Sequence, residues 1–88
     1  MKETMNCVGC RRILEQETVA FGGMLLEYRL LLVNDGGDRF RVRVALGSEA
    51  AEYGIGDQLA LALERYRLLV RGTVTPCCLR EVLEDLCG

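Results

Sequence analysis

Apolar and polar residues alternate along the first two thirds of the chain, a pattern typical of half-buried β-strands. The clearest case is residues 39–46, where Phe40 and Val42 alternate with arginines. Residues 24–33 show the same period of two, and residues 12–21 show it more weakly. Because side chains at this spacing point to opposite faces of a sheet, one face of each strand is predicted to be buried.

Turn residues separate these segments and predict hairpins. Residues 22–23 (Gly-Gly) fit a two-residue hairpin turn, and residues 34–38 combine Asn, Asp and Gly. Residues 47–48 (Gly-Ser) fit a type II′ turn, which requires glycine at its first position. Residues 49–55 are then predicted to return as a fourth strand, and a short helix over residues 49–52 is the alternative.

The last third of the chain changes to the period of amphipathic helices. Apolar residues recur every three or four positions over residues 58–71, with Asp57 as the predicted N-cap and Gly72 as the predicted left-handed residue after the helix. A second helix is predicted to begin at Pro76 with Thr75 as its cap, because proline suits the first helical position. Its predicted buried stripe consists of Leu79, Val82, Leu83 and Leu86.

Strands followed by helices predict an α+β domain. We expect a three- or four-stranded antiparallel meander followed by two C-terminal helices packed on one face, the face of Phe40 and Val42. At 88 residues the chain suffices for one domain with a thin core. We assign residues 12–88 to this domain and expect residues 1–11, which contain a Cys-x-x-C pair, to be a mobile leader.

Residues 74–86 read Val-Thr-Pro-Cys-Cys-Leu-Arg-Glu-Val-Leu-Glu-Asp-Leu. This segment resembles the closing signature of a family of short uncharacterised bacterial proteins, a domain of unknown function, which reads Val-Thr-Pro-x-His/Cys-Leu-x-Asp/Glu-Val-Leu-x-Asp. Members of that family have similar length and place a β-hairpin region before their helices, so the resemblance implies the same order here. Cys78 stands where the family has histidine, and both residue types bind zinc.

Composition argues against several functions. The 11 basic and 13 acidic side chains give a net charge of −2, which disfavours nucleic acid as a partner. The chain has no histidine, so Ser–His and Cys–His catalysis are excluded, and we expect no catalytic residues and no enzyme. Neither a run of about 18 apolar residues nor the apolar core of a secretory signal is present, so we expect a cytoplasmic protein without a membrane partner.

The five cysteines are the candidate metal or redox residues. Cys7 and Cys10 have the spacing of a two-thiolate zinc clamp, and Cys78 is the third candidate ligand. Cys77 and Cys78 project about 100° apart on a helix and are not expected to share one ion. The Cys-x-x-C pair lacks the strand–helix context of redox motifs, so the simpler interpretation is a set of unpaired thiols in a reducing cytosol.

Arginines line the predicted sheet face that points away from the core. Arg39, Arg41 and Arg43 lie on this face of one strand, and Arg29 lies on it in the neighbouring strand. Sheets that bind RNA usually add exposed aromatic side chains for stacking, but the aromatic residues of these strands fall on the core side. We therefore interpret the arginine face as a solvated surface.

Apolar residues in excess of the predicted core indicate an interaction surface. Leu61 and Leu68 lie off the core face of the first helix, and Leu31 and Val33 lie on the outer face of their strand. Contiguous apolar surface of this kind marks contacts with other proteins. We therefore expect a non-enzymatic protein-interaction or homodimerising module that uses these four residues, and the alternative is a zinc-binding accessory domain.

Overall fold

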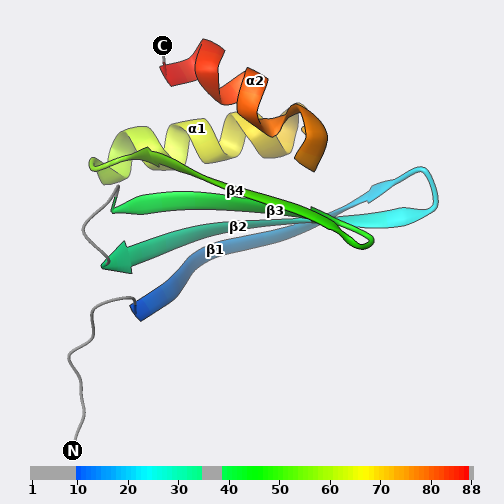
Figure 1. The fold of residues 1–88 in the computed structure, drawn as a ribbon, viewed down its shortest axis with the longest axis horizontal. Coiled ribbons are helices and arrows are strands. Elements are labelled where there is room, and N and C mark those ends of the chain that lie inside the picture. The colour runs from blue at the N-terminus through cyan, green and yellow to red at the C-terminus, as the bar shows by residue number, and fades with distance from the viewer. Residues whose placement is uncertain (1–9, 35–38, 88) are drawn as a thin grey trace, which may run out of the picture.

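The computed structural model describes residues 10–34 and 39–87 (Figure 1). Four strands precede two helices, so the α+β prediction is confirmed, as is the strand over residues 49–55. The elements are β1 (Cys10–Phe21), β2 (Met24–Asn34), β3 (Phe40–Leu46), β4 (Glu49–Gly56), α1 (Leu59–Arg71) and α2 (Pro76–Cys87). The predicted leader overlaps β1 at two positions, and residues 1–9 lie outside the described residues.

The strands form one antiparallel sheet in the order β1-β2-β3-β4. Gly22 and Gly23 have φ angles of +57° and +83°. A two-residue hairpin turn with positive φ at both positions favours glycine, because glycine adopts these angles without steric cost. Gly47 has a φ angle of +61°, as the first residue of a type II′ turn requires. Arg43 pairs with Glu52 across β3 and β4.

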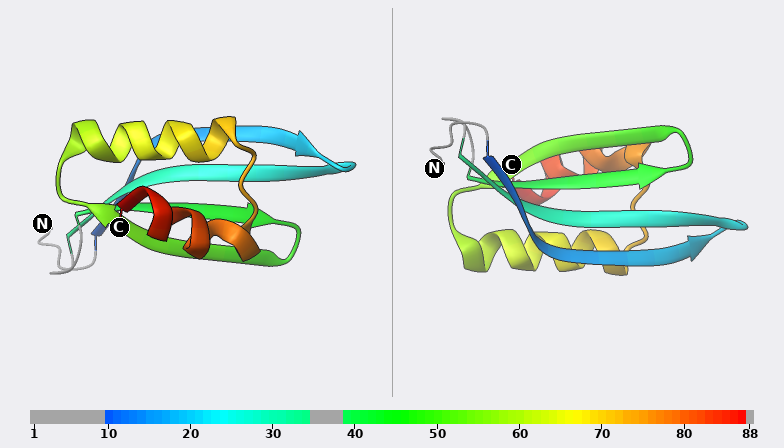
Figure 2. Two further views of the ribbon diagram at one scale, coloured as in Figure 1. Left: turned by 90° about the horizontal axis from the view of Figure 1, so that it is seen from above. Right: turned by 90° about the horizontal axis from the view of Figure 1, so that it is seen from below.

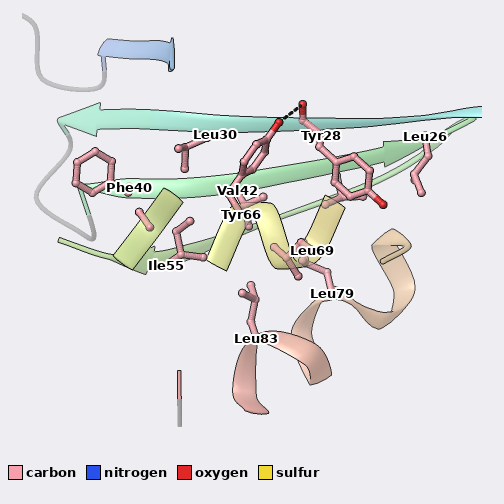
Figure 3. Close-up of a cluster of buried hydrophobic side chains, with 12 residues drawn as sticks. Leu26, Tyr28, Leu30, Phe40, Val42, Ile55, Tyr66, Leu69, Leu79 and Leu83 are labelled. Atoms are coloured by element: carbon pink, nitrogen blue, oxygen red, sulfur yellow. Dashed lines mark hydrogen bonds between the residues drawn. The ribbon is translucent and has the colours of Figure 1, made fainter. Parts of the chain in front are cut away.

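Both helices cover the same face of the sheet and run antiparallel to each other (Figures 1 and 2). Their apolar stripes close the predicted core against the inward side chains of β2 and β3 (Figure 3). The predicted stripe of α2 is confirmed, since all four of its apolar residues belong to this core or pack against it. The fully or nearly fully buried members are Leu26, Tyr28, Leu30, Phe40, Val42, Val44, Ile55, Ala62, Tyr66, Leu69, Leu79 and Leu83.

Two tyrosines connect the helices to the sheet through hydrogen bonds inside the core. The Tyr28 hydroxyl donates to the backbone oxygen of Val74, at 3.0 Å, in the loop between the helices. The Tyr66 hydroxyl donates to the backbone oxygen of Tyr28, at 3.3 Å (Figure 3). Burial raises the pKa of Tyr28 to about 12, so this hydroxyl stays a hydrogen-bond donor throughout the physiological pH range.

The predicted N-cap of α1 is wrong. Gln58, not Asp57, occupies the cap position, and its side chain makes no capping hydrogen bond. The Asp57 carboxylate instead accepts a hydrogen bond from the backbone nitrogen of Arg39, with Oδ1 at 3.0 Å. A distant part of the chain therefore takes the acceptor that the local sequence assigns to the helix.

The predicted left-handed residue after α1 is also wrong by one position. Gly72 has a right-handed conformation (φ −81°), and the left-handed residue is Thr73 (φ +53°). The backbone nitrogen of Thr73 donates to the oxygen of Val70, and that of Val74 donates to the oxygen of Leu69, both at 3.1 Å. This is the hydrogen-bond pattern of a Schellman motif in which a threonine takes the usual place of glycine.

Candidate functional site

Three leucines of α1 are exposed: Leu59 at its first position, and Leu61 and Leu68 farther along the helix. The side chains of Leu61 and Leu68 are 41% and 39% exposed. They lie one helical turn before and after Arg65, whose Nη1 donates to the backbone oxygen of Ile55 in β4, at 2.9 Å. Since α2 also lies over the β4 side of the sheet (Figure 2), the side of α1 that carries Leu61, Arg65 and Leu68 is the one nearer to α2.

The two helices carry opposite charges on their exposed surfaces. On α1, Arg67 and Arg71 are exposed toward the C-terminal end. On α2, the exposed charges are mostly acidic: Glu81, Glu84 and Asp85. Glu84 is partly compensated by Arg80 of the same helix, at 3.7 Å. α1 also exposes Glu64, so its C-terminal part is the basic region of the helix layer, and α2 is the acidic region.

Leu31 and Val33, the other two residues expected at the interaction surface, lie on the helix-free face of the sheet but are buried. Their side chains are only 5% and 4% exposed, so the expectation that they add exposed apolar area is wrong. Within the described residues, Leu31 pairs with Ile13 and Val33 with Arg11 of β1. Of the four residues expected at the interaction surface, only Leu61 and Leu68 are exposed.

Exposed apolar side chains also lie at the tip of the β1–β2 hairpin, where sequence reasoning did not place a surface. Phe21, Met24 and Leu25 are 39%, 47% and 63% exposed. The hairpin extends beyond the ends of both helices (Figure 1). The sequence could have indicated this protruding hairpin by the length of its strands, because the segments flanking the Gly-Gly turn are longer than the next two strands.

A shallow pocket of about 370 Å³ lies on the helix-free face. It is lined by Arg11, Ile13, Arg29, Leu31, Arg43 and Glu52, which come from all four strands. Arg11 of β1 forms an ion pair with Glu52 of β4, although these are the two edge strands of the sheet. Seen from the helix-free side, the first part of β1 passes in front of the neighbouring strands, which explains this contact (Figure 2).

A β-bulge in β1 gives this pocket its apolar wall. The register between β1 and β2 shifts between Ile13 and Glu15. Before the shift, Ile13 lies opposite Leu31 and faces the pocket, whereas Leu14 packs against the core. An extra residue of this kind redirects the side chains that precede it.

Glu52 accepts hydrogen bonds from two arginines at the edge of the pocket. Arg41 Nε donates to Glu52 Oε2 at 2.9 Å, and Arg11 pairs with the other carboxylate oxygen. Burial alone would raise the pKa of Glu52, but the hydrogen bonds and charges of these two arginines outweigh it and lower the pKa below its ordinary value. Glu52 is therefore an anion that is already neutralised by its neighbours.

The cysteine candidates are only partly described. Cys7 lies outside the described residues, and so does the side chain of Cys10, which leaves the predicted Cys-x-x-C clamp untested. Cys77 and Cys78 are exposed at the start of α2, and their sulfur atoms lie 3.9 Å apart. This corrects the expectation that they point too far apart to share one ion, because two sulfurs bound tetrahedrally at 2.3 Å are separated by about 3.8 Å.

Within residues 10–34 and 39–87, no group of three or more cysteine, aspartate or glutamate side chains is arranged to hold a metal ion. No helix in these ranges is long and apolar enough to cross a membrane. Comparison with protein-family models, with curated proteins and with solved structures gives no match. The family resemblance of residues 74–86 therefore stays a prediction.

Proposed function

We propose that the protein is a non-enzymatic interaction module that forms a homodimer through its helix layer. The observation that carries this proposal is the exposure of Leu61 and Leu68 on a helix that already buries Ala62, Tyr66 and Leu69 in its own core. The core does not need these two leucines. Their exposure is accounted for when a second copy covers them.

In the proposed dimer the helix layers of the two copies face each other across a two-fold axis that runs parallel to the helices. Because α1 and α2 are antiparallel, this axis sets α1 of one copy against α2 of the second copy, and all neighbouring helices are again antiparallel. Leu61 and Leu68 of both copies then approach the axis. Arg67 and Arg71 face the acidic α2 of the second copy, so the charges of the two layers are complementary.

The expected affinity is modest. About two fifths of each leucine side chain remains to be buried, which is worth about 1 kcal/mol per leucine and about 4 kcal/mol for the four in a dimer. Opposite charges between α1 and α2 add roughly 0.2–1 kcal/mol each. Association also costs translational and rotational freedom, so these terms set the tightest Kd to expect, of order 0.1 mM.

Sedimentation equilibrium in a reducing buffer, up to about 500 µM protein, tests the proposal. We expect the wild type to approach the mass of a dimer and the Leu61→Glu/Leu68→Glu variant to stay monomeric. The variant should still unfold cooperatively, at a lower temperature because each leucine is about three fifths buried within one chain. Leu25→Glu is the matched control, because Leu25 is 63% exposed and faces away from the helix layer. A wild type that stays monomeric over this range contradicts the proposal.

A zinc-binding accessory function is the second candidate. The observation that favours it is the 3.9 Å distance between the sulfurs of Cys77 and Cys78, which suits two thiolates on one ion. Further ligands would have to come from Cys7 and Cys10 or from a second copy. Zinc content measured in protein purified without added metal distinguishes this function from dimerisation through leucines alone.

A further inference from the structure

Two arginines face each other at the centre of the pocket on the helix-free face of the sheet. Arg29 and Arg43 occupy directly opposite positions of β2 and β3, and both line the pocket. Like charges in directly opposite positions destabilise an antiparallel pair. An anion between the two guanidinium groups removes this repulsion.

The carboxylate that lines this pocket is already bound by other arginines. Glu52 is bound by Arg11 and Arg41, so its charge is neutralised by arginines other than Arg29 and Arg43. Arg29 Nη2 lies 3.6 Å from Glu27 Oε1, which is beyond good hydrogen-bond distance. Arg29 Nε is buried, and no hydrogen-bond acceptor for it lies among the described residues. Arg29 thus carries one covered donor without an acceptor, and the donors that a ligand in the pocket would reach are its terminal Nη atoms.

The charge and size of the pocket indicate the class of ligand. Guanidinium groups bind phosphate and carboxylate in a bidentate manner, and the facing pair Arg29 and Arg43 matches a phosphate monoester, whose charge is close to −2 at pH 7. The volume of about 370 Å³ lies in the range of small-molecule sites. Leu31 and Ile13 provide an apolar wall beside the arginines, and Ile13 is 50% exposed.

We propose that this pocket binds a small phosphate monoester, with the phosphate group between Arg29 and Arg43 and the organic group against Ile13. The site lies on the sheet face opposite to the helix layer, so it does not depend on the dimer proposed above. The sequence predicts only a solvated arginine face. In the structure, the bulge in β1 places Ile13 beside the arginines, so that the otherwise flat surface becomes a pocket.

Calorimetric titration of the full chain with phenyl phosphate at low salt tests this inference, and inorganic phosphate serves as the reference ligand. We expect saturable binding with one site per chain, and phenyl phosphate should bind at least about threefold more tightly because of its contact with Ile13. Ile13→Ala should abolish this preference. Arg29→Gln and Arg43→Gln should each weaken binding by about tenfold or more.

Arg12→Gln is the matched control, because Arg12 is exposed on the same strand as Arg11 but does not line the pocket. It should change the affinity by less than about twofold. The ligand-free Arg29→Gln and Arg43→Gln variants should melt at or above the wild-type temperature, since each removes one of two facing like charges. This control shows that a loss of binding is not caused by a loss of folding. Equal losses in the control and the pocket variants, no saturation below about 10 mM phenyl phosphate, or binding of single-stranded RNA alone would each overturn the inference.

Discussion

Thr73 is the one residue other than glycine that has a positive φ in the described part of the chain, and replacing it with glycine should stabilise the protein. Its φ angle of +53° places a β-branched side chain in the left-handed region. That conformation costs a residue other than glycine about 1–2 kcal/mol. Glycine removes this cost but loses about 0.5–1 kcal/mol more backbone entropy on folding. We therefore expect Thr73→Gly to raise the free energy of unfolding by roughly 0.5–1 kcal/mol.

The hydrogen bonds of the Schellman motif explain why Thr73 keeps its strained left-handed conformation in the wild type. The backbone nitrogens of Thr73 and Val74 close the end of α1, and the Tyr28 hydroxyl binds the oxygen of Val74. These contacts require a left-handed residue at position 73 whichever side chain it carries. Glycine should keep all of them, so only the strain should be removed.

Thermal unfolding at about 5 µM, where the proposed dimer is a minor species, is the appropriate assay. For a domain of this size we expect the Tm to rise by about 3–6 °C. Thr18→Gly is the matched control, since Thr18 lies exposed in β1 with a negative φ and its replacement should lower the stability by about 0.5–1 kcal/mol. A Tm that falls in Thr73→Gly as it does in the control would refute the reasoning.

Two further predictions concern the core and the cysteines. Val42→Asp should unfold the domain, because Val42 is 0% exposed and the new carboxylate would be buried among apolar side chains; circular dichroism unchanged by this substitution would contradict the packing of the helices on this face. Elemental analysis of protein purified without added zinc should give less than about 0.1 zinc per chain if the thiols are unbound, whereas stoichiometric zinc that falls on Cys77→Ser/Cys78→Ser would establish the metal function instead.

The strands and helices were predictable because the hydrophobic period and the hairpin glycines act locally. The period of two over residues 39–46 and the turn at residues 47–48 suffice to predict β3, β4 and the pairing of their residues. The start of α2 follows from Pro76, whose missing N–H has no helical partner at that position. In these elements the residue types and the tertiary structure favour the same conformation.

The structure differs from the sequence-based predictions where a residue distant in the sequence makes a contact that local patterns do not reveal. Asp57 would cap α1 in isolation, but the backbone nitrogen of Arg39, which is 18 positions away, binds its carboxylate. Leu31 and Val33 look exposed from their strand alone, but Ile13 and Arg11 of β1 lie opposite them. The bulge at Leu14 has no glycine or proline to mark it, so neither this contact nor the pocket can be read from the pattern.

The dimer is tested most directly by exchanging the charges of the two helices and mixing the products. In the Arg67→Glu/Arg71→Glu variant both helices are acidic, and in Glu81→Arg/Asp85→Arg both are basic on their exposed surfaces. If α1 of one copy packs on α2 of the other, each variant alone should be monomeric by sedimentation at about 500 µM, and an equimolar mixture should form a heterodimer. A Glu81→Arg/Asp85→Arg variant that dimerises as well as the wild type, or a mixture that stays monomeric, would contradict this arrangement.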